Sequence, residues 1–189
     1  MLRPAIASFA FMLLMGAWFS TGIQLPVYDL QKALVAEILK AVFFHITPLS
    51  SLLGEGLILE GGSYVLSSNH GILPILSLSL AGLLTGALSR SVQQALMAAI
   101  TSAIFLLLLA IFLLLGFLPS LPGPENMKWQ VDNVFAAIFG DRPLDLPTLI
   151  AVTALSSLPT GKLMEWLLAE RVEEEPLFSW RRRSTVEAG

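Results

Sequence analysis

Long apolar stretches separated by short polar ones make up most of the chain. Four of these stretches are residues 5–28, 72–89, 95–118 and 146–169. About 17 to 25 predominantly apolar residues cross a bilayer as a helix, so each stretch predicts a transmembrane helix. The stretch at 95–118 has the strongest signal, whereas Pro159 and Gly161 interrupt the last one. The pattern therefore predicts an all-α integral membrane protein with about four spans.

Residues 29–46 follow a different pattern, with an apolar and a charged side at helical spacing. The apolar positions are Leu34, Ile38 and Val42, and the charged positions are Asp29, Lys32, Glu37 and Lys40. This arrangement is typical of an amphipathic helix. We expect it to lie at the extracytoplasmic membrane interface and to end before Pro48, since proline stops a helix.

A glycine pair marks the segment "GLILEGGSYVL". Gly61 and Gly62 stand between two short runs of β-prone residues, a pattern that predicts a β-hairpin. An open sheet edge cannot face lipid, so this hairpin is expected outside the hydrocarbon, on the extracytoplasmic side.

Basic residues near the span ends predict the orientation. With four spans, Arg3, Arg90 and the arginines at 181–183 all fall on one side. Positive residues favour the cytoplasmic side, so both termini are expected in the cytoplasm. We interpret residues 1–189 as a single membrane domain with a polar cytoplasmic tail at 170–189, multi-pass in the bacterial inner membrane.

Composition supports the membrane setting and excludes several chemistries. The chain is 55% hydrophobic and 13% charged, whereas about a quarter of a typical soluble domain is charged. The formal charge of −3 and the lack of a basic stripe argue against nucleic acid as a partner. The chain has no cysteine, which excludes a disulfide, a thiolate metal site and a cysteine nucleophile. Membrane lipids and other membrane protein subunits remain the expected partners.

The segment "GEGLILEGGSYVLSSNHGILPILSLSLAGLLTGALSRS" resembles the core of the exosortase/archaeosortase family of membrane transpeptidases. The resemblance covers about residues 50–118 and lies in glycine placement and layout. In that family, a glycine-punctuated hairpin leads to a short motif of cysteine, serine and glycine at the outer end of a helix. A turn with basic residues then precedes the next helix.

The residues that carry catalysis in that family are missing here. The family's cysteine would fall at about Asn69 and its following glycine at Gly71, yet the chain has no cysteine. The helix after the basic turn has no arginine, and no histidine follows His70. The resemblance therefore implies a pseudoenzyme, and no residue is assigned a catalytic role.

A membrane hydrolase or transpeptidase using Ser68 and His70 is one alternative, because an oriented imidazole can activate a hydroxyl. No clear orienting acid lies nearby in the sequence. The other explanation for the polar run Ser67–His70 is a cap that satisfies the first free amides of the following helix.

Cofactor binding is a second alternative, with His45 and His70 as the candidate ligands. Neutral imidazole binds haem iron or chlorin magnesium, so either histidine could serve a subunit of an electron-transfer or light-harvesting complex. Two histidines are too few for a histidine-rich metal site, and the cofactor is unknown. The interpretation we favour is a non-catalytic membrane subunit or scaffold of a larger membrane protein complex.

Overall fold

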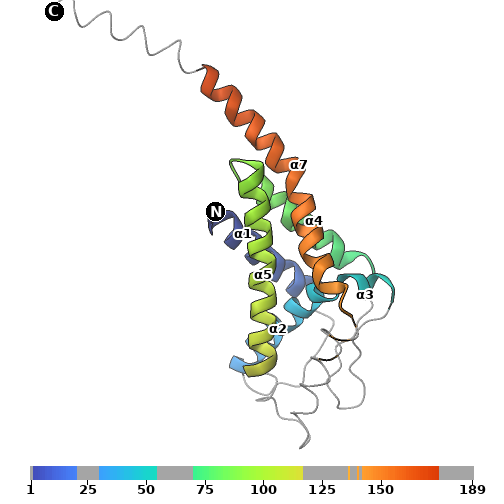
Figure 1. Cartoon of the computed structure of the whole chain (residues 1–189). Helices are drawn as coiled ribbons and strands as arrows, with labels where there is room; N and C mark the ends of the chain where they lie inside the picture. Colours follow the sequence, from blue (N-terminus) through green and yellow to red (C-terminus); the bar gives the residue numbers. More distant parts are fainter. Residues whose placement is uncertain are drawn as a thin grey trace, which may run out of the picture.

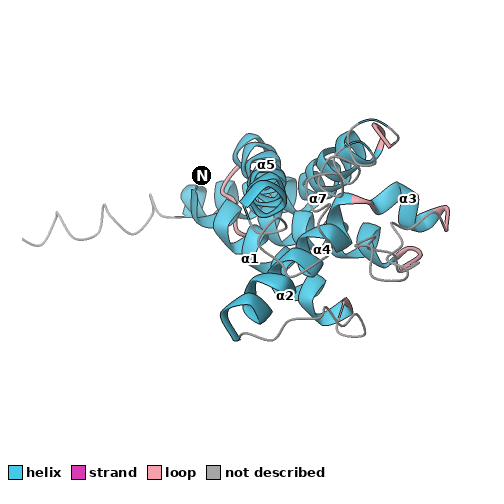
Figure 2. Ribbon diagram, turned by 90° about the horizontal axis from the view of Figure 1, so that it is seen from below, coloured by secondary structure: helices cyan, strands magenta, loops and turns pink. Residues whose placement is uncertain are grey.

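A computed structural model describes the structure of residues 2–20, 30–54, 70–116, 136, 140 and 142–174. Its helices are α1 (Leu2–Phe19), α2 (Leu30–Ile46), α3 (Pro48–Leu52), α4 (Leu73–Ala87), α5 (Val92–Gly116) and α7 (Asp145–Glu174). Figure 2 shows only helices and loops in these segments. The described part of the chain is therefore all-helical.

Helices α1, α4, α5 and α7 form a bundle in which successive helices run in opposite directions (Figure 1). The start of α1 and the turn between α4 and α5 lie at one end, which we call the arginine end because it carries Arg3 and Arg90. The opposite end, the α3 end, holds α3 and the starts of α4 and α7. Helix α7 continues past the bundle at the arginine end (Figure 1).

The core lies where α1, α2, α4 and α5 meet. Its fully buried large side chains include Met12, Leu39, Val42, Leu78, Leu106 and Leu114. Small residues alternate with them, so that the helices come close together. Ser8 on α1 donates to the carbonyl of Ala81 on α4 at 3.2 Å. Such hydrogen bonds between small polar residues are typical of helix packing in membranes.

Helix α4 makes its most extensive contact with α7, and glycines allow the close approach. A Cβ atom on Gly86 would lie 2.8 Å from the backbone nitrogen of Gly161 and would also overlap Thr160. Thr160 donates its hydroxyl to the carbonyl of Leu83 at 2.9 Å, which joins the two helices directly. The contact between α4 and α7, which we call the seam, therefore accommodates only glycine at position 86.

The prediction of four transmembrane helices is wrong. Within the described residues, only α1 and α5 are long and apolar enough to cross a membrane. Helix α4 has 15 residues, about 22 Å at ~1.5 Å per residue, which is shorter than the ~30 Å hydrocarbon core. Helix α7 is long, but its serine, threonine, proline and charged residues lower its apolar content. The predicted hairpin at 56–66 lies outside the described residues, and the described ones contain no strand.

The predicted amphipathic helix exists as α2 but is not an interfacial helix in its second half. All residues from Leu39 to Ile46 are buried, including Lys40, whose ammonium pairs with Glu37 at 2.5 Å. The prediction recognised one apolar face, and Phe43 and Phe44 bury the adjacent face as well. The C-terminal half of α2 is thus part of the core.

Candidate functional site

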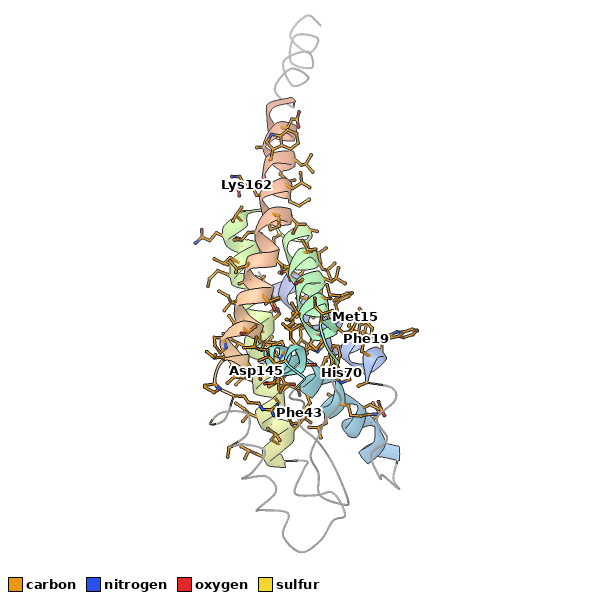
Figure 3. The ribbon with its side chains drawn as sticks, turned by 90° about the vertical axis from the view of Figure 1, so that its right-hand side faces the viewer. Met15, Phe19, Phe43, His70, Asp145 and Lys162 are labelled. Carbon is orange, nitrogen blue, oxygen red and sulfur yellow. The ribbon has the colours of Figure 1, made fainter. Side chains whose placement is uncertain are left out.

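Both candidate histidines lie at the α3 end, among polar side chains from several helices. We define the polar cluster as His45, Ser50, Ser51, His70, Ser77 and Asp145. Figure 3 shows Asp145 and His70 on either side of α3. Residues from α2, α3, α4 and α7 are therefore brought together by the packing of the bundle.

His45 is fully buried and both of its ring nitrogens are bonded. Its Nδ1 lies 2.9 Å from the carbonyl oxygen of Ala41, so Nδ1 carries the proton and donates. The other nitrogen, Nε2, then accepts the hydroxyl of Ser77 on α4 at 2.7 Å. Burial lowers the pKa of His45 to about 4. The hydrogen bond to Ala41 raises the pKa, but by less than burial lowers it. The imidazole is therefore neutral near pH 7 and joins α2 to α4.

The lowered pKa of His45 predicts acid sensitivity. The unfolded chain takes up a proton near pH 6.5, whereas the folded chain does so only near pH 4. Stability is thus complete above about pH 6.5 and decreases as the pH falls toward 4. We expect a decrease in the free energy of unfolding of about 2 to 3 kcal/mol. Unfolding of the purified protein in detergent across this range measures it.

The control for this prediction is His45→Gln, which removes the titrating group. The variant is expected to be less stable at pH 7 but to lose much of the slope between pH 6.5 and 4. His70→Gln isolates the second histidine, whose pKa burial also lowers. A slope that His45→Gln leaves unchanged would show that His45 is not the sensitive group.

Asp145, at the start of α7, binds the first turn of α3. Its Oδ1 accepts the backbone N–H groups of Leu49 at 2.7 Å and Ser50 at 2.9 Å. Its Oδ2 accepts the hydroxyl of Ser50. The N-cap residue of α3, Thr47, makes no side-chain cap bond, so the carboxylate of another helix satisfies these amides. Asp145 is 2% exposed and holds α3 against α7.

His70 precedes α4 and contacts both α3 and α2. Its backbone N–H donates to Ser51 Oγ at 3.1 Å, and its ring packs edge-on against Phe44 with centroids 4.8 Å apart. The N-cap residue of α4, Ile72, makes no side-chain cap bond, and the carbonyl of His70 accepts the N–H of Leu73 instead. His70 therefore contributes its backbone carbonyl to the start of α4.

The cluster contains a serine–imidazole pair, but not the predicted one. Ser68 and Asn69 lie outside the described residues, so their relation to His70 stays a prediction. In the pair that the structure brings together, a backbone carbonyl orients His45 and Ser77 is 1% exposed. The carboxylate of Asp145 serves α3 instead.

Ligand binding by the histidines can be judged from the same geometry. A metal on His45 would replace the hydrogen bond to Ala41 or to Ser77. Among the described residues, no group of three histidine, cysteine, aspartate or glutamate side chains could hold a metal ion. The arrangement thus fits joining helices better than binding a metal, although binding of a cofactor through His45 or His70 stays a prediction.

Sequence reasoning did not identify Asp145 or Ser77 as members of the site. A signal for Asp145 was present, because an aspartate two residues before Pro147 is typical of a helix start. That signal gives no partner, since Leu49 is 96 positions away. Ser77 lies inside the apolar stretch 72–89, where nothing local marks it as a partner of His45.

Comparison with protein-family models, curated proteins and solved structures gives no match for this chain. The resemblance of residues 50–118 to exosortases therefore stays a prediction. The function has to be argued from the surfaces and contacts of the molecule.

Proposed function

We propose that the protein is a non-catalytic membrane subunit or scaffold of a larger membrane protein complex in the bacterial inner membrane. The observation that carries this proposal is the distribution of side chains in α1 and α5. Their outward faces carry large apolar residues, and their inward faces carry serine and alanine beside a few large core residues such as Met12 and Leu106. Lipid or another apolar protein surface is the natural neighbour of such a face.

The exposed fractions make this distribution clear. Leu14 and Trp18 on α1 are 70% and 74% exposed, and Phe112 on α5 is 71% exposed. In contrast, Ser8 on α1 and Ser102 on α5 are 0% exposed and lie 3.3 Å apart, Oγ to Oγ. The outside of these two helices is therefore as apolar as the core, and buried serines join the helices from within. Large apolar side chains over the outer face, with small polar residues between the helices, support a membrane location.

The polar cluster supports a structural rather than a catalytic role. Asp145 is bonded to α3, and His45 is bonded to its own helix and to Ser77. A nucleophile needs access to its substrate and a base free to take its proton. Both atoms of the serine–imidazole pair are almost completely buried, so the cluster is better suited to fixing α2, α3, α4 and α7 in place.

The same proposal includes an orientation. Arg3 and Arg90 lie at the arginine end, and positive residues favour the cytoplasmic side of a membrane. We therefore place the arginine end, with the starts of α1 and α5, on the cytoplasmic side and the α3 end on the extracytoplasmic side. Helices α4 and α7 return the chain between these two ends packed against α1, α5 and each other, and not as long apolar spans of their own. The C-terminal tail is expected on the cytoplasmic side too, because α7 emerges at the arginine end (Figure 1).

Single cysteines test the membrane location, since the natural chain has none. Leu108→Cys on α5 and Leu163→Cys on α7 replace residues with nearly equal exposure, 56% and 53%. In native membranes, a water-soluble maleimide should label Leu163→Cys and spare Leu108→Cys. Equal labelling of both would exclude a membrane location for α5.

Leu53→Cys adds the test of orientation, because Leu53 is exposed at the α3 end. In intact cells, an impermeant maleimide should reach Leu53→Cys and not Leu163→Cys. The reverse result would invert the proposed orientation.

Co-purification tests the role as a subunit. Gentle detergent extraction followed by size separation and mass spectrometry should find the chain migrating with defined membrane partners. An absorption spectrum of the same fraction reads out a bound pigment or haem. A chain that migrates alone in every mild detergent would contradict the subunit role. A coloured fraction that bleaches on replacement of His45 would favour a cofactor-binding subunit instead.

A further inference from the structure

An open pocket of about 630 Å³ lies at the arginine end, far from the polar cluster. It is lined by Leu2, Arg3, Pro4, Leu88, Arg90 and Gln94. These residues come from the start of α1, the turn after α4 and the first turn of α5. The pocket thus joins two segments that are distant in sequence, residues 2–4 and 88–94, and two of its side chains are arginines.

The electrostatics of the pocket favour an anion. Helices α1 and α5 both begin here, at Leu2 and Val92, and the N-terminus of a helix carries a partial positive charge. Arg3 and Arg90 add two full charges, and neither forms an ion pair with a carboxylate of the described residues. Two helix N-termini and two guanidinium groups therefore act in the same direction. Phosphate is the anion that such an arrangement typically binds.

Nearby polar groups are used in shaping the pocket. Gln94 accepts the backbone N–H of Arg90 through Oε1 at 3.0 Å, and its own N–H donates to Ser91 Oγ at 3.2 Å. These bonds fix the turn that presents Arg90. The nearest acid in the contacts is Glu165 on α7, which accepts the N–H of Val92 at 3.0 Å and does not line the pocket. Its single negative charge lowers the positive potential near the start of α5, against the two full positive charges of Arg3 and Arg90.

The apolar residues that line the pocket indicate which kind of molecule the phosphate belongs to. Leu2 and Leu88 line the pocket and are 62% and 51% exposed. A headgroup phosphate on the arginines would leave its acyl chains beside these leucines and the apolar outer face of α1. A soluble phosphate compound would leave both leucines in water.

We propose that this pocket binds the phosphate group of an anionic phospholipid. This inference rests on the proposed membrane location, with the arginine end at the cytoplasmic surface. The shared chemistry is a phosphate held by two guanidinium groups, and a soluble phosphate could offer the same contacts. The experiment therefore compares lipid with free phosphate.

Lipid titration of the purified protein in detergent tests the pocket, with bound lipid counted by native mass spectrometry. Phosphatidylglycerol should bind more tightly than phosphatidylcholine, and added salt should reduce the difference. Arg3→Gln and Arg90→Gln should each weaken phosphatidylglycerol binding about fivefold, the effect of one basic residue near a membrane surface. Lys162→Gln is the matched control, because it removes a positive charge outside the pocket and should change binding less than twofold.

Arg3→Lys and Arg90→Lys check that a loss comes from charge rather than from misfolding, and both should retain most of the binding. Equal binding of the two lipids by the wild-type protein, or an equal loss in Lys162→Gln, would overturn the pocket. If inorganic phosphate bound as tightly as the lipid and with the same dependence on the arginines, the proposal that the ligand is a phospholipid would be wrong. Protection of Leu108→Cys in membranes, with no effect of either arginine, would overturn the pocket and leave the membrane proposal intact.

Discussion

Gly86→Ala is expected to destabilise the bundle by about 3 kcal/mol or more, at the upper end for overpacking of a close contact. The added Cβ would overlap Thr160 and the carbonyl of Ser157 and would lie 2.8 Å from the backbone nitrogen of Gly161. Two of these three atoms belong to the backbone, which cannot turn aside as a flexible side chain can. Alanine favours a helix over glycine by about 0.5–1 kcal/mol, so the clash outweighs propensity. Unfolding in detergent measures the change.

Gly116→Ala is the matched control, at the last residue of α5. A Cβ there meets nothing within 4 Å, so this variant should be neutral or slightly more stable. If Gly86→Ala were as stable as Gly116→Ala, the close packing of α4 on α7 would not exist in solution. Gly82→Ala provides a repeat of the test, because its Cβ would overlap Ser156 and the carbonyl of Thr153.

The seam at Gly86 also shows where sequence patterns were informative. Small residues of the second apolar stretch, Gly86 among them, predict close packing of a neighbouring helix, and Gly86 lies in a close contact with α7. The helices themselves follow the apolar pattern, most clearly α5, which spans Val92–Gly116 against the predicted 95–118. A long uninterrupted apolar run leaves few other structures possible.

The number of spans could not be predicted in the same way. Apolar composition indicates a helix, whereas crossing a bilayer also requires length, and α4 ends at Ala87 after only 15 residues. Leu88 and Ser89 then form the turn that precedes α5. The apolar stretch 72–89 is therefore longer than the helix that it forms, and its composition alone overestimates the number of spans.

The candidate site was only partly predictable, because it depends on contacts between distant segments. His45 was recognised as a residue of interest, but its partner Ser77 is 32 positions away and nothing local points to it. The burial of His45 depends on how α2 packs against α1 and α5, which periodicity within α2 cannot show. Tertiary packing thus decided what this histidine does.

The two ends of the bundle have different physical characters, which ties the two proposals together. At the α3 end, the hydrogen bonds of His45 and Asp145 join α2 to α4 and α3 to α7, which suits a role in fixing the helices. At the arginine end, two cationic side chains line an open pocket and carry no ion pair with a described carboxylate. Binding of a phosphate would therefore occur at the arginine end, and the rigidity of the α3 end is best tested through Asp145.

Asp145→Ala is expected to cost about 3 kcal/mol or more, because it removes one acceptor from three donors at once. The backbone amides of Leu49 and Ser50 and the hydroxyl of Ser50 would lose their acceptor in a buried setting. Each buried donor left without a partner costs about 1–3 kcal/mol. Amide hydrogen exchange at Leu49 and Ser50 should rise together with the loss of overall stability, because α3 would detach from α7.

Asp145→Asn separates the loss of hydrogen bonds from the loss of charge. Its amide oxygen can still accept the N–H groups of Leu49 and Ser50, so its cost should fall well below that of Asp145→Ala. Ser50→Ala removes only the hydroxyl contact and is expected to cost about 1 kcal/mol, the net value of one hydrogen bond. If Asp145→Ala were no less stable than Ser50→Ala, the carboxylate would not be holding α3. The order alanine, asparagine, wild type at position 145 would instead show that the start of α7 fixes α3 through one buried side chain.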